Sequence, residues 1–369
     1  MGYVAVKGGF EAIEHAAQLL AYERSKGSSQ PLELEQIKEQ LYLAVDRVMG
    51  EGSLYAPDLA ALALKQAAGD TLEAAFMLRA YRATKPRLGY TIPQSTTEMR
   101  LIRRISAAFK DVPGGQILGA ATDYTLRLLD FELLDDSSEK RKTYLQELFN
   151  QIHEVDPLPE SFPKVIEILR QENLLVAKAP ADGGTAEIFD LTRQSLTYPV
   201  ARSTALQAMA RGETGGLLLL AYSSMRGYGD IHPAIAELRV GFLPVKIKSP
   251  DSGEPRLVGE VKVTEAEVIA RYTSQEGSPK FTLGYGLCFG HNEIKAISMA
   301  ILDRTMQAPD PQLPCENQEF VLSHIDGIES MGFCNHWKLP HYVTFQSDLD
   351  RLRKTRQVMK TEDKAVNPK

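Results

Sequence analysis

Cysteine is scarce in this chain of 369 residues, which contains only Cys288, Cys315 and Cys334. Three thiols without CxxC spacing do not build a disulfide framework, although counting alone does not exclude a single disulfide. An odd thiol favours a reducing compartment, so we expect a cytoplasmic protein. An iron-sulfur cluster held by this chain alone is excluded, because such a cluster needs a group of cysteines.

Long apolar runs are also absent. The most apolar run, 217–222, is far shorter than the roughly 20 residues that a membrane-spanning helix needs, and it is typical of buried core. The first residues lack the long apolar core of a signal peptide. The net charge of -6 and the pI of about 5.8 exclude a broad basic surface. We therefore expect neither nucleic acid nor a membrane as a partner.

The composition, 43% hydrophobic and 24% charged, is that of a globular protein. The length predicts two or three units of roughly 150 residues. The pattern favours the α+β class, with a helical N-terminal part after a short leading strand and a C-terminal part of antiparallel strands packed on helices. The predicted units are a mainly helical domain over 1–134, a charged, proline-punctuated insert over 135–197, an α+β domain over 198–353 and a flexible tail over 354–369.

Hydrophobic periodicity gives the individual elements. Helical spacing predicts helices at 10–26, 34–48, 57–68, 71–81, 165–175, 202–211 and 292–305. Alternation and apolar runs predict strands at 3–7, 240–248, 257–264, 281–290 and 319–323, with 249–253 as a hairpin connection and 264–272 open between helix and strand. Glycines in 281–290 predict a close approach of another backbone or a ligand. On the last helix we expect Ile294 in the core and Lys295 and Arg304 in solvent.

Basic residues near glycines are candidates for binding phosphate. Arg103 and Arg104, expected on a helix, precede the turn 111–116, and Arg226 opens a glycine-flanked loop. A guanidinium group matches phosphate oxygens, but pairing with the abundant acidic side chains explains the two arginines equally well. Lys7 precedes two glycines at a helix start, an arrangement that suits an anion or is simply a structural turn.

Two carboxylates, Asp123 and Asp130, are seven residues apart and would share a face if the segment between them were helical. Paired carboxylates perform acid and base catalysis and stabilise cationic character on a sugar. Asp123 is explained equally well as the N-cap of a helix.

Two histidines, His336 and His341, are five residues apart and enclose Pro340. This spacing fits neither one face of a helix nor one face of a strand, but a bend at the proline can bring both rings together. The pair then forms part of a metal site, or consists of two unrelated histidines on a turn. On a strand, Cys334 would face the same side as His336 and would be a candidate third ligand.

Ten short stretches follow one another in a specific order. They are YVAVKGG at 3–9, LAVDRVM at 43–49, LALKQA at 62–67, LRAYR at 78–82, RRIS at 103–106, DVPGGQIL at 111–118, DYT at 123–125, RGYG at 226–229, GYGL at 284–287 and KLPHY at 338–342. In this order the chain resembles the PhnI family, the I subunit of carbon-phosphorus lyase in bacterial phosphonate metabolism. The family pattern does not match the segments 135–197 and 248–280 or the tail after 353.

The resemblance implies a core complex with the G, H and J subunits, on which the ATPase subunits K and L dock. It implies a nucleosidase component, in which a phosphonate displaces the purine of ATP or GTP, supplied as the magnesium complex, at the anomeric carbon of ribose. The product would be ribose 1-phosphonate 5-triphosphate, or ribose 5-triphosphate with water. The resemblance also implies a metal, usually zinc, on His336 and His341 at the contact with the radical J subunit.

For this reaction Asp123 and Asp130 are the catalytic candidates, and the candidates for triphosphate contacts are Lys7, Arg103, Arg104 and Arg226. Two alternative hypotheses for the function remain open. In the first, the chain is a non-catalytic scaffold that supplies the histidine-metal site to the J subunit. In the second, it is an independent metal-dependent hydrolase.

Overall fold

The computed structural model describes residues 9–152, 159, 162–176, 189–226, 232–273, 278–339 and 341–366. The predicted leading strand at 3–7, and Lys7 with it, lies outside these residues. In chain order the elements are α1 (Gly9–Ser25), α2 (Leu34–Gln40), α3 (Tyr42–Gly52), α4 (Pro57–Gln66), α5 (Thr71–Ala83), η1 (Thr96–Glu98), β1 (Arg100–Ile105), η2 (Phe131–Asp135), α6 (Ser138–Gln151), α7 (Val165–Gln171), α8 (Arg202–Arg211), α9 (Thr214–Ser223), β2 (Ala234–Lys248), β3 (Pro255–Thr273), β4 (Lys280–Phe289), α10 (Glu293–Thr305), η3 (Pro314–Glu316), α11 (Gln318–His324), α12 (Gly327–Trp337) and α13 (Tyr342–Val366).

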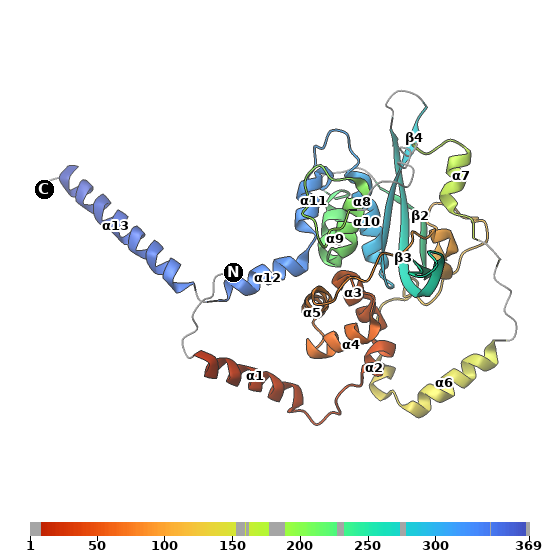
Figure 1. Cartoon of the computed structure of the whole chain (residues 1–369), viewed down its shortest axis with the longest axis horizontal. Helices are drawn as coiled ribbons and strands as arrows, with labels where there is room; N and C mark the ends of the chain where they lie inside the picture. The colour runs from red at the N-terminus through yellow and green to blue at the C-terminus, as the bar shows by residue number, and fades with distance from the viewer. Residues whose placement is uncertain are drawn as a thin grey trace.

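The centre of the molecule is an antiparallel sheet with the strand order β1-β2-β3-β4. The predicted hairpin between the two long strands is confirmed, because the backbone N–H of Ser249 donates to the carbonyl of Glu254 at 2.9 Å. The open segment 264–272 continues β3. Helices α8, α9 and α10 lie on one side of the sheet and α7 on the other (Figure 1). The protein is therefore of the predicted α+β class.

Helix α10 lies directly on β4 because two glycines leave room for it. A Cβ atom on Gly284 would lie 1.9 Å from the carbonyl oxygen of Ala300, and one on Gly286 would lie 2.1 Å from that of Ala296. The predicted close approach at these glycines is thus confirmed. The main core lies at this contact and includes Met299 and Leu302 of α10.

Helices α2 to α5 enclose a second core around Val48 and Met49. The predicted helix 34–48 is interrupted at Leu41, which separates α2 from α3. Arg79 of α5 ties these helices to the rest of the chain by donating to both carboxylate oxygens of Asp326, at 2.9 and 2.7 Å. Strand β1, within the predicted domain 1–134, pairs with β2 of the C-terminal part. The domain boundaries themselves stay predictions.

Two secondary-structure predictions are wrong. Residues 100–105, expected on a helix, form strand β1, because pairing with β2 supplies hydrogen bonds that the local sequence does not reveal. Residues 319–323, expected as a strand, lie in α11, where the side chain of Asn317 caps the helix by accepting from the N–H of Phe320 at 2.8 Å.

Three burial predictions also need correction. Lys295 is fully buried on α10, whereas its neighbour Ile294 is exposed. Arg304 is partly buried rather than solvated. The run 217–222 lies in α9, where Leu217 is buried but Leu219 is 70% exposed. The buried faces of α9 and α10 differ from the predicted ones, because neighbouring elements cover these helices on more than one side.

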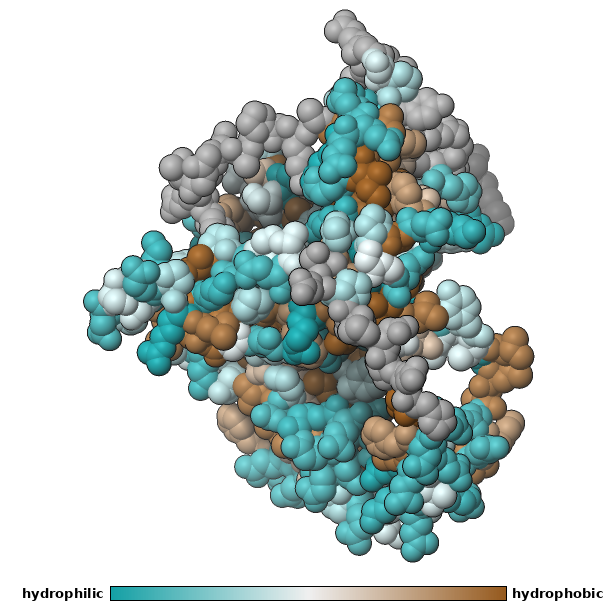
Figure 2. Space-filling model, turned by 90° about the vertical axis from the view of Figure 1, so that its right-hand side faces the viewer, coloured by the Kyte–Doolittle hydropathy of each residue, from teal (hydrophilic) through white to brown (hydrophobic). Residues whose placement is uncertain are grey.

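Helices α1, α6 and α13 extend away from this body (Figure 1). Neither α1 nor α6 has a buried side chain among its described residues. Exposed apolar side chains on them include Phe10, Leu20 and Phe149. On the face seen in Figure 2, hydrophobic side chains gather in several separate patches among hydrophilic ones. Of the helices in the described part of the chain, none is both long and apolar enough to cross a membrane.

Candidate functional site

Arg103 is the centre of a group of ionisable side chains. The pairing of β1 with β2 shifts register between Leu101 and Arg103, and such a bulge redirects side chains. The Arg103 side chain is buried, and its guanidinium group forms ion pairs with Asp123 and Glu293. Burial alone would lower the pKa of Arg103, but these two carboxylates raise it above its ordinary value. One buried cation therefore joins two carboxylates from distant parts of the chain.

These carboxylates line a cavity of about 620 Å³, which we call the Asp123 cavity. Its volume is that of a typical small-molecule site. It lies at the N-terminal ends of α9 and α10. The lining residues are Tyr42, Leu43, Arg47, Ala120, Ala121, Thr122, Asp123, Arg127, Thr214, His291, Asn292, Glu293, Ile294 and Ile297.

His291 and Glu293 form a pair at the start of α10. Gly290, with a φ of 76°, makes the turn into this helix against Asp46, where a Cβ atom would lie 2.5 Å from the Asp46 Cβ. Nε2 of His291 lies 3.1 Å from Oε1 of Glu293. Burial would raise the pKa of Glu293, but His291 and Arg103 together hold it below its ordinary value. Among the described residues, no side chain forms a hydrogen bond with Nδ1 of His291.

Two further arginines line the cavity. Arg47 is already engaged, because it donates to Glu51 at 2.9 Å and to Glu213 at 2.5 Å. Arg127 has no ion-pair partner among the described residues, and its φ of 55° is uncommon for a residue with a Cβ atom. Backbone strain of this kind often marks a functional position. The cavity thus offers one unpaired guanidinium group to an anionic ligand.

The structure brings only one of the two predicted aspartates to this cavity. Asp123 does not cap a helix; it lies in a turn in which Thr125 N–H donates to the Thr122 carbonyl at 3.1 Å. Asp130 is exposed and caps the 3-10 helix η2 by accepting from the N–H of Glu132 at 3.0 Å. The segment between the two aspartates is not helical, so the predicted shared helix face does not exist.

The other predicted phosphate contacts lie elsewhere. Arg104 is buried against Glu237, with 2.5 Å between Nε and Oε1, and it also donates to the carbonyl of Pro163 at 2.7 Å. Arg226 follows the C-terminal end of α9, whereas the cavity meets the N-terminal end, and its Nη1 donates to the Tyr222 hydroxyl at 2.7 Å. Among the described basic residues predicted to bind phosphate, Arg103 alone forms ion pairs with residues that line the Asp123 cavity, namely Asp123 and Glu293.

The two histidines of the sequence motif do come together. His336 lies near the end of α12 and His341 just before α13 (Figure 1), and their Nε2 atoms are 3.1 Å apart. Two imidazole nitrogens on one tetrahedral zinc ion lie about 3.3 Å apart. Nδ1 of His341 is 2.6 Å from the carbonyl of Leu339, which fixes its proton there and leaves Nε2 as a lone-pair donor. The pair therefore fits a zinc ion geometrically.

Cys334 does not complete this pair. Residues 334 and 336 lie on helix α12 rather than on a strand, so their side chains point in nearly opposite directions. Across the described residues, no group of three or more His, Cys, Asp and Glu side chains is positioned to hold a metal ion. All three cysteines are free thiols.

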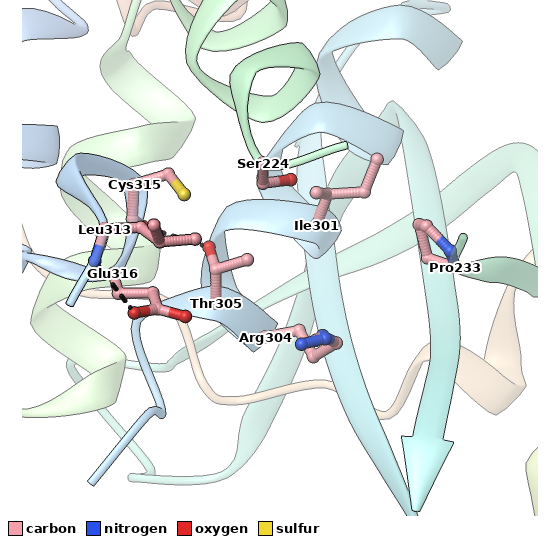
Figure 3. A pocket seen from close by; sticks show the side chains of 8 residues that line it. All are labelled: Ser224, Pro233, Ile301, Arg304, Thr305, Leu313, Cys315 and Glu316. Carbon is pink, nitrogen blue, oxygen red and sulfur yellow. Dashed lines mark hydrogen bonds between the residues drawn. The ribbon is translucent and has the colours of Figure 1, made fainter. Parts of the chain in front are cut away.

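A much smaller cavity of about 20 Å³ lies beside η3, and its lining includes Cys315, Ser224 and Ile301 (Figure 3). This volume accommodates about one water molecule. Burial raises the pKa of the Cys315 thiol and makes it a poor nucleophile. This cavity is therefore not a substrate site.

The sequence reasoning missed His291, Glu293, Arg47 and Arg127. A histidine directly before the N-cap Asn292 was a usable signal, because the start of that helix was correctly predicted. The two arginines gave no local signal, since only tertiary packing brings α3 and the 120–127 segment to α10.

Residues 2–359 match the family described as bacterial phosphonate metabolism protein (PhnI). The chain belongs to this family. It is 56% identical to the putative C-P lyase subunit protein HtxH of Stutzerimonas stutzeri, with 96% of each chain covered. It is 46% identical to the alpha-D-ribose 1-methylphosphonate 5-triphosphate synthase subunit PhnI of Escherichia coli (strain K12), and 44% identical to that of Rhizobium meliloti (strain 1021). These matches cover 96% of this chain, and 98% and 95% of the relatives.

Proposed function

We propose that this chain supplies the nucleosidase step of carbon-phosphorus lyase in phosphonate catabolism. A phosphonate oxygen attacks C1 of the ribose of ATP or GTP as the bond to the purine nitrogen breaks. The purine leaves with the electron pair and takes up a proton. The family membership supports the pathway, and the Asp123 cavity, with its paired carboxylates, is the observation that supports the chemistry.

Positive charge develops on the sugar as the purine leaves, and a carboxylate beside the ring stabilises this charge. Asp123 has this role in our proposal, because its carboxylate faces the cavity and is held by the buried Arg103. His291, oriented by Glu293, is positioned to exchange the proton with the purine. Arg127 contributes positive charge for the triphosphate, which enters as its magnesium complex.

The proposal is tested with Asp123→Asn in the full-length chain purified with its partner subunits. Release of free adenine from ATP should fall by about 100-fold or more, because the amide cannot balance positive charge on the sugar. Asp130→Asn, a substitution of the same kind at an exposed carboxylate outside the cavity, serves as the matched control and should keep the rate within about twofold. Equal rates for wild type and Asp123→Asn would remove Asp123 from the mechanism.

We also propose that His336 and His341 bind zinc and that a partner subunit completes the coordination. Their Nε2 distance suits zinc, and two protein ligands leave the coordination open. A zinc ion there would act as a Lewis acid or hold a reacting group at the subunit contact. His341 is exposed and His336 is half-buried, and α13 extends from the body of the protein, so a partner can reach the pair.

Zinc content of the purified complex, measured by plasma mass spectrometry, tests this site. His336→Ala and His341→Ala should each lower zinc binding by tenfold or more. His324→Ala is the control, because His324 is exposed and its Nδ1 contacts the Phe320 carbonyl at 2.6 Å. Full zinc occupancy in both histidine variants would contradict the proposal.

The proposed partners are the G, H and J subunits of the core and the docking ATPase subunits K and L, and the proposed location is the cytoplasm. Exposed apolar side chains on α1, the 124–134 segment and α6 support an assembly, since a monomer rarely leaves such surface in water. The names of the relatives, a C-P lyase subunit and two synthase subunits, agree with this proposal.

A further inference from the structure

A second polar cavity, the Glu267 cavity, lies between α7, α8 and β4 and has a volume of about 310 Å³. Its apolar walls are Ile166 of α7, Leu206 of α8 and Leu283 of β4. It shares no lining residue with the Asp123 cavity. This size suits a small molecule rather than a nucleoside triphosphate.

One carboxylate that lines this cavity is incompletely bonded. Glu267 is 3% exposed, and its Oε1 accepts from Nζ of Lys164 at 2.8 Å. Its Oε2 is also buried, yet it has no hydrogen-bond partner within the described part of the chain. Burial raises the pKa of Glu267; the charge of Lys164 opposes this shift and the neighbouring Glu265 adds to it. A buried carboxylate oxygen without a donor is costly, so this position favours a ligand that brings one.

The lysine cannot supply the missing contact alone, because it is shared. Nζ of Lys164 lies 2.8 Å from Oε1 of Glu265 as well as 2.8 Å from Oε1 of Glu267. Glu265 has additional donors in Arg239 and Tyr285 and is fully bonded. Glu267, unlike Glu265, therefore lacks a hydrogen-bond donor and a positively charged partner of its own among the described residues.

Two arginines that line the same cavity have the opposite charge. Arg202 uses Nε and Nη2 to bind Asp303, at 2.8 and 2.5 Å, which leaves Nη1 without a partner among the described residues. Arg170 contacts Glu167 through Nη1 only. Both arginine side chains are about one-third exposed, so the remaining N–H groups are accessible to an anion.

We infer that the Glu267 cavity binds a small zwitterion, whose ammonium group donates to the carboxylate of Glu267 and whose oxyanion meets Arg170 and Arg202. An ammonium group provides both the donor and the positive charge that the buried carboxylate lacks. Guanidinium groups accept a carboxylate or a phosphate equally well, so an amino acid and an amino-alcohol phosphate are the two sources of this chemistry. This inference is independent of the proposed nucleosidase function.

Isothermal titration calorimetry on the full-length chain, purified with its partner subunits, tests the inference. The probes are β-alanine, 2-aminoethyl phosphate and ethyl phosphate, which lacks the ammonium group. At least one zwitterion should bind tenfold more tightly than ethyl phosphate, and comparing the two zwitterions identifies the oxyanion. Glu267→Gln should remove this tenfold preference. Glu260→Gln, an exposed carboxylate on the same strand, should leave it unchanged.

Leu206→Trp provides a second variant that keeps the buried charges and fills the cavity. It should abolish binding of every probe. The inference is overturned if neither zwitterion binds at millimolar concentration, if ethyl phosphate binds as tightly as both, or if Glu267→Gln and Leu206→Trp leave zwitterion binding intact.

Discussion

Arg103 and Arg104 are adjacent in the sequence and buried in the structure, yet they contribute differently. Arg103 forms ion pairs with two carboxylates that line the Asp123 cavity. Arg104 points to the other side of the strand, where it is sealed against Glu237 and backbone carbonyls. The first residue contributes to the site, and the second contributes to stability.

Removing Arg104 should therefore destabilise the fold. Arg104→Ala leaves the buried Glu237 carboxylate with the N–H of Val165, at 3.1 Å, as its one remaining hydrogen-bond donor among the described residues, and should lower the free energy of unfolding by about 3–5 kcal/mol. Arg100→Ala, on the same strand, removes an exposed pair with Glu260 and should cost about 1 kcal/mol or less. Urea unfolding followed by circular dichroism measures both. Similar losses in the two variants would show that Arg104 has no special structural role.

At the scale of elements, the contact between α10 and β4 positions the site. Because α10 lies directly on the strand, its N-terminal residues His291 to Glu293 reach the end of the sheet where Arg103 emerges. The same helix carries Asp303 at its other end, beside the Glu267 cavity. One helix therefore contributes to both cavities.

This contact depends on glycine. In Gly284→Ala the added Cβ would lie 1.9 Å from the Ala300 carbonyl oxygen, so helix and strand must separate. Overpacking usually destabilises a protein by about 1–3 kcal/mol, and we expect this substitution to reach or exceed the upper end of that range. Gly259→Ala on β3 adds a Cβ with nothing within 4 Å and should change stability by about 0.5 kcal/mol or less. Thermal unfolding of the two variants provides the comparison, and equal transition temperatures would contradict the packing argument.

At the scale of the whole molecule, the contrast lies between a packed body and extended helices. The body has two main cores, around α10 and around α3 to α5. Helices α1 and α6 contribute to neither, although exposed apolar side chains such as Phe10 and Leu20 lie on α1. Such helices gain stability only when another surface covers them.

Hydrogen exchange should reveal this contrast. In the isolated full-length chain, amides of α1 and α6 should exchange with little protection, whereas those of α10 should be among the slowest, because local opening follows burial. In the purified complex, α1 and α6 should gain protection of tenfold or more if partner subunits cover them. Unchanged exchange in the complex would assign these helices another role. Mass spectrometry of peptides from both samples makes the measurement.

Local patterns predicted much of the fold. The hairpin of β2 and β3, the glycine-bearing β4 and the helices α4, α5, α8 and α10 follow from periodicity and caps within short windows. Strand β1 and helix α11 were mispredicted, because the first depends on a partner more than 130 residues away and the second on a cap outside the apolar run. For the site, Asp123, Arg103 and the approach of His336 to His341 were identified in advance, but their companions were not.

The sequence by itself determined the α+β class, the family and the bend that brings two histidines together, since each depends on neighbouring residues or on the order of motifs. Only the tertiary structure decided that Asp123, His291 and Glu293 line one cavity, with Arg103 paired to two of them, while Asp130, Arg104 and Arg226 lie outside it. The reason is physical: a side chain's charge is local, but its partners are set by strand register and helix packing across distant parts of the chain.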